Sequence, residues 1–480
     1  MSVLVIDIGT SGVRAAIVRD DGTVGHVHHR RTPPEVPFPG LVEFDAVALA
    51  DAALEVAIAT IAAAGPVSAV GITNQRASTV MWDRRTGTPL GNALGWQDLR
   101  TVFDCLTVNA DGFHLAPNQS ATKAAWLRTN LDPDRQHDVC FGTIDTWLAW
   151  RLSNGEAFIT DATNAAVTGL CTSDGTDWDD RALDRLAIDR SSLATIVDSS
   201  GSLATAHALP GAPAITALCG DQQASLIGQG CVRPGMAKIT FGTGGMLDLC
   251  LGGERPTIDH RGPAGTFPIV AWRHDGTLTW GLEAIMLSAG SCIEWLRDDM
   301  GLIAEPAESH TLAASCASSG GVVFVPALMG LGTPKWDFGA RGLLIGLTRG
   351  SGRAEICRAV LEGVAHRGAD LIDAAEKDAG VTLEAIRVDG GMTANPTFLE
   401  SLANATGRRV EVSPVLEATT LGAGFLAGVS AGTWSSLAEA ASTWRPAQIL
   451  EPSTPLDRGR WTEAVRRSES WEPELSALDF

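Results

Sequence analysis

"VIDIGTSGVRAAIVRDDG", residues 5–22, decides the fold of this 480-residue chain. An apolar, β-forming run ends at Asp7, the chain turns through residues 9–12, and a second apolar run follows. The Asp-Gly pair at 21–22 accepts positive φ and predicts a hairpin turn. The stretch therefore predicts an antiparallel meander over residues 2–24.

A second stretch repeats this pattern near the middle of the chain. "KITFGTGGMLDLCL", residues 238–251, reads as a strand, a Gly-Thr turn and another strand. Gly9 and Gly242, which open the two turns, lie 233 residues apart. A repeat over such a distance indicates two related halves that face each other.

Composition limits the class of protein. The length allows two to four domains at about 100–200 residues each. No apolar run is expected to approach the roughly 18 residues that cross a membrane, and no signal peptide is expected. The net charge of −20 disfavours a nucleic-acid surface. Nine scattered cysteines without a CxxC pair favour a reducing cytoplasm over a disulfide or metal framework.

Further segments predict the remaining framework. We expect a long helix between Asp45 as N-cap and Gly65 as stop, followed by a buried strand. Residues 212–230 predict a strand, a turn and a helix, and residues 383–407 predict the same order. Residues 418–432 predict a helix of small residues that can approach a neighbour closely.

Both Gly-Thr turns have the chemistry of a phosphate-binding loop. Such a turn between strands directs backbone N–H groups into a concavity that binds anions. The hydroxyls of Thr10 and Ser11 add donors at the first turn, and Thr243 adds one at the second. We expect the two turns to hold a polyphosphate from both sides. An ordinary hairpin is the alternative for either turn taken alone.

Two aspartates lie where a nucleotide site needs them. Asp7 ends the first strand beside the turn, and a carboxylate next to phosphates requires a cation between them, such as Mg²⁺. Asp221 begins a helix after a buried strand, and we expect it to act as a general base toward an attacking hydroxyl. Turn capping by Asp7 and helix N-capping by Asp221 are the alternatives.

With these residues collected, the sequence resembles the FGGY family of carbohydrate kinases, and most closely its glycerol kinase branch. The resemblance covers nearly the whole chain. The matching segments are "DIGTSGVR", "GITNQR", "GTIDTWLAWRL", "TDATNA", "WDD", "GDQQASLIGQ", "GMAKITFGTG", "AGSCIEWLRD", "VPALMGLGTPKWD", "ARGLLIGLTRG", "VDGGMTANPTF" and "TTLGAGFLAG". Their number and order make the resemblance specific.

The resemblance implies an α/β fold of two ribonuclease-H-like domains, as in the actin and hexokinase superfamily, with ATP in the cleft between them. The N-terminal domain would span 1–232 and hold the polyol site, the first phosphate turn and insertions at about 86–215. The C-terminal domain would span 233–445 and hold the nucleotide site, and 446–480 would form a helical tail. ATP and Mg²⁺ are the implied cofactors. We expect a homodimer or homotetramer without nucleic-acid or membrane partners.

The resemblance also implies roles for individual residues. Asp221 matches the catalytic base, and Asp7 serves magnesium through water. The positions that match phosphate-contacting segments are Thr10, Ser11, Gly12, Arg14 and Thr243. Further nucleotide positions are Gly290, Glu294, Gly391 and Asn395, with Glu294 in place of a family glutamine. The positions that line the polyol pocket are Arg76 and Trp96, with Gln222 beside the base.

Three pocket positions depart from the glycerol kinase pattern. A glutamate after the pocket arginine is Ala77 here, a tyrosine is Asn118, and a phenylalanine aligns with Leu287. Losing a charge-assisted hydrogen bond costs about 1.5–3 kcal/mol, or roughly ten- to a hundredfold in affinity. We therefore expect ATP-dependent phosphorylation of a polyol or sugar larger than glycerol, with four or five carbons. Phosphorylation of glycerol itself is the first alternative, and an actin-like or heat-shock-type ATPase is the second.

Lys238 precedes the second turn. We expect it to lie at a strand edge on the surface rather than against phosphate.

Overall fold

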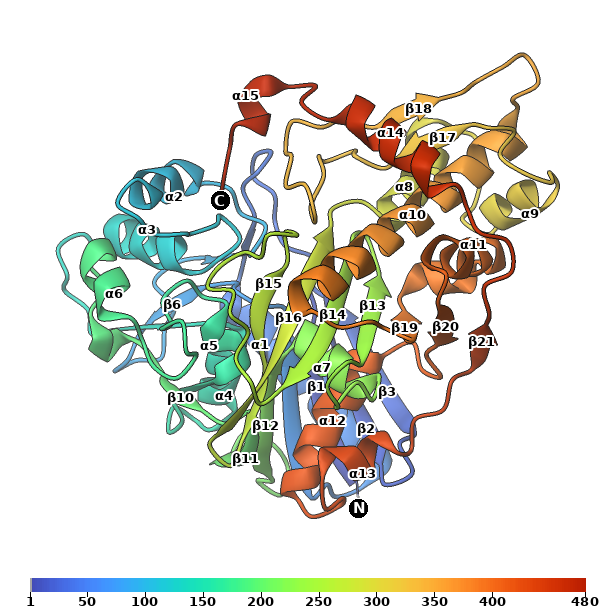
Figure 1. Cartoon of the computed structure of the whole chain (residues 1–480). Helices are drawn as coiled ribbons and strands as arrows, with labels where there is room; N and C mark the ends of the chain where they lie inside the picture. The colour runs from blue at the N-terminus through green and yellow to red at the C-terminus, as the bar shows by residue number, and fades with distance from the viewer. Residues whose placement is uncertain (1) are drawn as a thin grey trace.

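Two halves with the same strand order form the molecule (Figure 1). The structure is a computed structural model and describes residues 2–480. In the first half the spatial order is β3 (Val24–Arg31), β2 (Gly12–Arg19), β1 (Ser2–Ile8), β5 (Ala69–Asn74) and β12 (Ala214–Gly220). The strands β1 to β3 are antiparallel, whereas β1, β5 and β12 run parallel. The predicted meander is therefore confirmed.

The second half repeats this topology. Its order is β16 (Thr277–Met286), β14 (Gly245–Gly252), β13 (Ala237–Phe241), β19 (Ala385–Asp389) and β20 (Arg409–Val412), with the same antiparallel and parallel pairings. The two halves are joined at the edge of the sheets, where Ser200 of β11 (Ser200–Thr205) pairs with His274 of β15 (Phe267–His274). The duplication predicted from the two turns is present in the fold.

The apolar helix α1 (Ala46–Ala64) covers one face of the first sheet. It is long and apolar enough to cross a membrane, with a mean hydropathy of 1.9, so the expectation that no run has this character is wrong. Half of its apolar window is buried, and the helix packs against β1, β2 and β3. Asp45 caps its N-terminus through two backbone N–H groups, and Gly65 ends it, as predicted. Packing against the sheet accounts for its composition.

Short elements between β5 and β12 form the left-hand part of Figure 1. They are β6 (Val80–Asp83), β7 (Ala93–Leu94), α2 (Val102–Asn109), α3 (Ala121–Leu131), β8 (Val139–Gly142), α4 (Ile144–Leu152), β9 (Ile159–Asp161), α5 (Ala162–Ala166), α6 (Asp180–Leu186) and β10 (Thr195–Val197). The small strand β4 (Glu43–Phe44) pairs with β7. Several of these elements share a hydrophobic cluster of their own, so they form a satellite on the first half.

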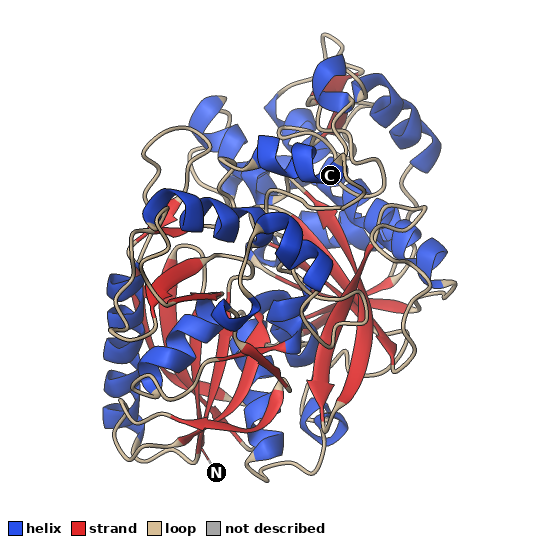
Figure 2. Ribbon diagram, turned by 90° about the vertical axis from the view of Figure 1, so that its left-hand side faces the viewer, coloured by secondary structure: helices blue, strands red, loops and turns tan. Residues whose placement is uncertain are grey.

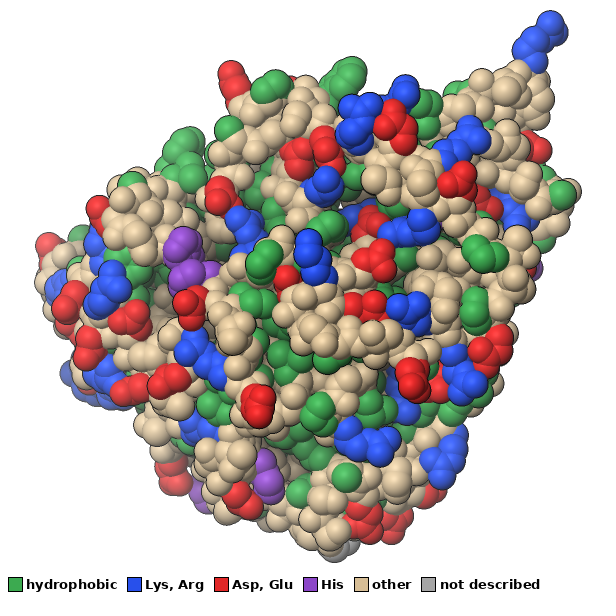
Figure 3. Space-filling model, viewed as in Figure 1, with side chains coloured by type: hydrophobic (Ala, Val, Ile, Leu, Met, Phe, Trp, Pro, Cys, Tyr) green, Lys and Arg blue, Asp and Glu red, His purple; other side chains and the backbone are tan. Residues whose placement is uncertain are grey.

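Helices also cover the second sheet (Figure 2). They include α8 (Gly290–Glu294), α9 (Glu308–Ala314), α10 (Arg353–Ala379) and α11 (Pro396–Thr406), and β17 (Val323–Val325) pairs with β18 (Leu343–Ile345). The short helix α13 (Leu437–Ala441) packs instead against α12 (Ala418–Ser430) and α7 (Asp221–Gly228). The segment expected as a helical tail contains the edge strand β21 (Gln448–Leu450) and then α14 (Arg458–Ser468) and α15 (Pro473–Ser476). Figure 3 shows acidic and basic side chains interspersed over the face seen in Figure 1.

Helices α7 (Asp221–Gly228) and α12 (Ala418–Ser430) touch more closely than ordinary helices do. A Cβ on Gly228 would overlap the carbonyl oxygen of Ala418, and a Cβ on Gly422 would overlap that of Ala224. Helix α12 also packs on β1, β5 and β12, although it comes from the C-terminal part of the chain. The close approach predicted from its small residues is confirmed, and it fixes the position of α7, which begins with Asp221.

We predict that Gly422→Ala destabilises the protein severely, because its new methyl group would meet backbone rather than a movable side chain. Overpacking of a rigid site costs about 1–3 kcal/mol or more, so the thermal midpoint should fall by several degrees or the chain should fail to fold. Gly253→Ala is the matched control, because a Cβ there has no heavy atom within 4 Å. Equal melting temperatures of the two variants would contradict the packing argument.

Candidate active site

The two Gly-Thr turns open toward solvent at the ends of equivalent strands. In the first turn, Gly9 N–H donates to the Gly12 carbonyl over 2.9 Å, and Ser11 is exposed. The indole N–H of Trp96 donates to Thr10 Oγ1 over 3.2 Å. In the second turn Thr243 is exposed, and the turn is braced by Gly290 N–H, which donates to the Gly242 carbonyl over 2.9 Å. Both turns therefore keep hydroxyl groups available at the surface of the site.

Asp7 lies below the first turn and is 8% exposed. Burial raises its pKa to about 7, although the Arg14 guanidinium, 3.6 Å away, acts in the opposite direction. The negative charge of Asp221 raises the pKa of Asp7 further, so the two carboxylates interact electrostatically. Arg14, predicted to contact phosphate, also forms an ion pair with Glu417. A cation beside Asp7 would offset the cost of its buried charge.

This environment fits magnesium held by one carboxylate. Within residues 2–480 there is no group of three or more His, Cys, Asp or Glu side chains that could hold a metal ion by themselves. Mg²⁺ commonly uses one or two carboxylates and takes its other ligands from water and phosphate. Asp7 offers one carboxylate and lies at the end of β1, next to the first Gly-Thr turn. Turn capping does not account for its position, because no backbone N–H group among residues 2–480 donates to its carboxylate.

Asp221 lies where the two halves meet. Gly220 is the N-cap of α7, so Asp221 occupies the first helical position and is not the cap. Its carboxylate accepts from the N–H of Gln222 over 2.8 Å and lies 3.5 Å from Arg76 Nε. Burial raises its pKa, and Arg76 opposes that effect. A raised pKa moves this carboxyl toward the range in which a general base works near neutral pH.

Arg76 connects the halves. Its Nη2 donates to Glu283 Oε2 over 2.6 Å, so the guanidinium joins Asp221 of the first half to β16 of the second. A Cβ on Gly220 would lie 2.9 Å from Arg76 Cγ and Cδ, so this glycine makes room for the arginine stem. Ala77 adopts φ +61°, an uncommon conformation for a residue with a side chain. The backbone after Arg76 is thus bent in a way typical of functional sites.

Three charged residues near Asp221 belong to the second half. Lys238, Asp248 and Glu283 are neighbours across β13, β14 and β16. The expectation of a surface Lys238 is wrong, because its side chain is fully buried and its Nζ lies 2.8 Å from Asp248 Oδ2. Ile239 and Phe241, on the other face of β13, point into the hydrophobic core. Period-two alternation therefore sends Lys238 toward α7.

The structure also places the remaining candidates. Trp96 donates its backbone N–H to Ser78 Oγ over 3.0 Å, and its carbonyl accepts from the buried Lys123 Nζ over 3.0 Å. Ser120 Oγ donates to the Ala77 carbonyl over 3.0 Å, which brings the loop of the exposed Asn118 close to Ala77. Leu287 follows β16 and lies beside the second turn.

The nucleotide candidates lie on the second half, beyond the second turn. Gly391 and Glu294 are exposed, on the 3₁₀ turn Gly391–Ala394 and at the end of α8. Asn395 caps α11 by accepting from Phe398 N–H over 3.1 Å, and its Nδ2 donates to Ser309. The predicted N-cap is therefore confirmed, and this side chain is already engaged by the protein.

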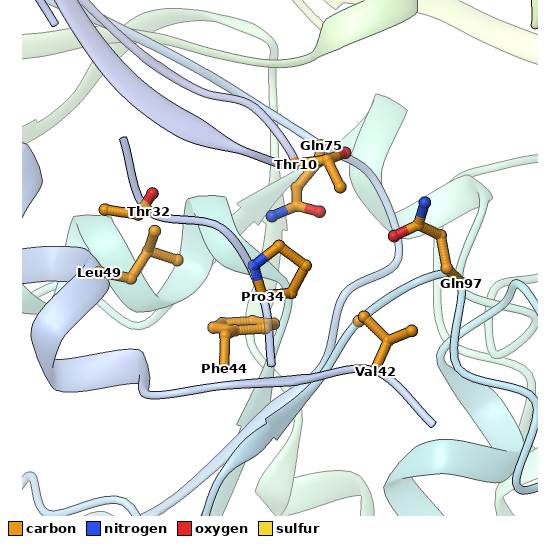
Figure 4. Close-up of a pocket in the computed structure, with 9 residues that line it drawn as sticks. Thr10, Thr32, Pro34, Val42, Phe44, Leu49, Gln75 and Gln97 are labelled. Carbon is orange, nitrogen blue, oxygen red and sulfur yellow. The ribbon is translucent and has the colours of Figure 1, made fainter. Parts of the chain in front are cut away.

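A small pocket adjoins the first turn (Figure 4). Its polar lining comes from Thr10, Thr32, Gln75 and Gln97, and its apolar lining from Pro34, Val42, Phe44 and Leu49. Gly95 and Gln97, the neighbours of Trp96 in sequence, both belong to it. Sequence reasoning did not assign Lys238, Asp248 and Glu283 to the site. The sequence signal that could have found them is that each is a single charged residue within a mostly apolar strand.

We predict that Asp7→Asn stabilises the protein without nucleotide or magnesium, by more at pH 8 than at pH 5 and not at all below about pH 4. The folded-state pKa of about 7 lies above the ordinary 3.8, so the protonated form is favoured in the fold. The stability that the wild type gains from binding this proton is fully present below about pH 4 and is lost as the pH rises through 7. Thermal melts should show a gain of a few degrees at pH 8. Asp134→Asn, at an exposed site, is the control, and equal shifts for both variants would contradict the burial argument.

Comparison with known proteins matches this geometry. The model of the FGGY family of carbohydrate kinases, N-terminal domain, matches residues 2–228, and that of the C-terminal domain matches residues 237–431. The chain is 41% identical to the glycerol kinase of Halorhodospira halophila, covering 98% of this chain and 97% of the relative. It is 41% identical to that of Trichlorobacter lovleyi, with 98% and 99% covered.

Solved structures show the same architecture. Plasmodium falciparum glycerol kinase with ADP superposes with a TM-score of 0.90 at 29% identity over 97% of this chain and 98% of that one. A xylulose kinase from Lactobacillus acidophilus, at 21% identity, shares the fold with a TM-score of 0.86 over 100% of this chain and 99% of that one. The repeated halves and these matches show that the chain belongs to the FGGY family of carbohydrate kinases and is an ATP-dependent enzyme of that class.

Proposed function

We propose that the enzyme transfers a phosphoryl group from Mg-ATP to a hydroxyl of a small polyol, with Asp221 as general base. The observation that carries this proposal is the position of Asp221 between the two halves, with its carboxylate 3.5 Å from Arg76. Arg76 lies beside the carboxylate and opposes the rise in its pKa that burial causes. A base in this state takes a proton from the acceptor hydroxyl as that oxygen attacks phosphorus.

The two turns and Asp7 form the donor side of the proposed reaction. Thr10, Ser11 and the backbone of Gly12 would donate to phosphate oxygens from the first half, and Thr243 from the second; Ser11 and Thr243 are exposed. Further nucleotide contacts would come from Gly290, Gly391 and the neighbourhood of Asn395 and Glu294. Asp7 would hold Mg²⁺ through water, and the ion would neutralise charge on the phosphates. Asp7 thus serves the metal and Asp221 the proton.

The acceptor pocket determines the substrate. Arg76, Trp96 and Gln222 supply polar contacts, while Ala77 supplies no functional group where glycerol kinases have a glutamate. The neighbouring pocket in Figure 4 offers the amide of Gln97 and the hydroxyl of Thr10 as partners for additional hydroxyl groups, while the Gln75 amide is already bonded to Gly9 and Ser78. We therefore propose a polyol or open-chain sugar of four or five carbons.

Glycerol is the second candidate substrate. The relatives that share about 41% identity over nearly the full length are named glycerol kinases, and Arg76, Trp96 and Asp221 match their pocket. No observation favours the actin-like or heat-shock-type ATPase. A cytoplasmic homodimer or homotetramer remains our expectation.

We predict that Asp221→Asn lowers kcat by about 10²–10⁴-fold, because an amide cannot accept the proton. ADP binding, measured by calorimetry, should stay within about twofold, since this side chain lies on the acceptor side. A kcat within tenfold of the wild-type value would remove Asp221 from the role of base.

We predict that four- and five-carbon acceptors exceed glycerol in kcat/KM. ADP release should be compared for glycerol, erythritol, xylitol, ribitol, D-xylulose and D-ribulose. Ala77→Glu should raise the ratio of glycerol to erythritol turnover by about tenfold or more, because it restores a charged acceptor for one hydroxyl. Glycerol emerging as the best acceptor of the wild-type enzyme would defeat the proposed preference.

A further inference from the structure

Lys238 is a fully buried lysine that reaches from one half of the molecule to the other. It lies on β13 of the second half, and its Nζ is 2.8 Å from Gln222 Oε1 on α7, which continues from β12 of the first half. The other two contacts of the ammonium are Thr240 Oγ1 at 2.9 Å and Asp248 Oδ2 at 2.8 Å. Two hydrogen bonds and one ion pair therefore hold the ammonium group.

This contact determines which way the Gln222 amide points. An ammonium group can only donate, so the side-chain atom facing Lys238 must be the amide oxygen. The amide nitrogen is then directed away from Lys238, and it has no recorded hydrogen-bond partner among residues 2–480. Gln222 is partly exposed and adjoins Asp221. Its two N–H groups are thus free to donate to an oxygen held in front of the base.

We propose that Lys238, anchored by Asp248, is a positioning residue that fixes Gln222 as a hydrogen-bond donor to an oxygen of the acceptor substrate. The proposal rests on the proposed function, since it assigns the acceptor side of that site. It also makes recognition of the acceptor substrate depend on the contact between the two halves, because Lys238 and Gln222 come from different halves. A hydroxyl next to the reacting one, or a carbonyl oxygen, is the group that such a donor binds.

The same lysine acts on the base through its charge. The charged or titratable groups around Asp221 include Arg76 from the loop after β5 and Glu283 of β16, which pairs with Arg76. They also include Lys238 and Asp248 from β13 and β14, Asp7 from β1, and Cys219 from β12. Burial raises the pKa of Asp221, Lys238 lowers it, and Asp248 raises it. Removing Lys238 and Asp248 together therefore removes one charge that lowers the pKa of Asp221 and one that raises it, while the contact with Gln222 is lost.

The test uses the double variant Lys238→Met/Asp248→Leu, because an apolar pair of similar size replaces a buried ion pair without leaving an unpaired charge. Asp248→Asn is the matched control, since it keeps Lys238 and an acceptor for it. Gln222→Glu keeps the contact with Lys238 but removes the free N–H donors. Steady-state kinetics are measured with glycerol and with erythritol at saturating Mg-ATP between pH 6 and 9. They give KM, kcat and the fall of kcat toward acidic pH.

We expect KM for the better acceptor to rise about tenfold in the double variant and in Gln222→Glu. KM for ATP should be unchanged in both variants, and Asp248→Asn should leave the acceptor KM within twofold. Combining the double variant with Gln222→Glu should produce no additional rise, because both changes remove the same donor. The pH at which kcat falls on the acidic side should be nearly the same in the double variant and in the wild type. An acceptor KM within twofold of wild type, or an additive combined effect, would overturn the proposal.

Crystal structures of the wild type and the double variant test whether Lys238 holds the Gln222 amide in place, without a measurement of activity. We expect the Gln222 amide to leave its position when Lys238 and Asp248 are replaced, and an unchanged Gln222 would overturn the proposal. A wild-type enzyme that phosphorylates no acceptor in the panel would defeat the proposed function instead. The two failures are therefore distinguishable.

Discussion

Buried charge at the junction of the halves is the constraint on which the rest of the structure depends. Asp248 and Glu283 are neighbours on adjacent strands, where like charges destabilise a sheet. Lys238 balances the first and Arg76 balances the second. Since unpaired buried charges cost several kcal/mol each, this row is stable only when Arg76 of the first half reaches β16 of the second. The position of Arg76 then determines where Asp221 can lie.

Helix α7 is held from the opposite side by backbone packing. Gly228 and Gly422 let α7 and α12 approach until no side chain fits between them, and α12 itself rests on β1, β5 and β12. The first turn of α7 therefore has little freedom to move along the helix axis. A general base has to lie within hydrogen-bond distance of the proton that it takes, so this rigidity serves the proposed chemistry directly.

The site contains two carboxylates, Asp7 and Asp221, whose pKa values are both raised by burial but whose neighbours differ. Asp7 and Asp221 both have raised pKa values, but Asp7 faces Arg14 and the phosphate turn, whereas Asp221 faces Arg76 and the acceptor pocket. The different neighbours give them different tasks in the proposed reaction, one toward a metal ion and one toward a proton. In the proposed reaction, magnesium would be the additional partner of Asp7 and the polyol that of Asp221.

The sequence by itself determined the repeated strand–turn–strand unit, the capped helix α1, the close approach of α12 and the positions of Asp7 and Asp221, because local propensity, turn chemistry and residue spacing specify these features. It failed at Lys238, whose expected surface position was contradicted, and at Asp248 and Glu283, which carried no local motif. Only the tertiary structure decided their roles. Strands that are far apart in the sequence place these side chains in one row, and their partners Arg76 and Gln222 come from the other half. Charge pairing across such separations depends on how the halves pack, which no local pattern encodes.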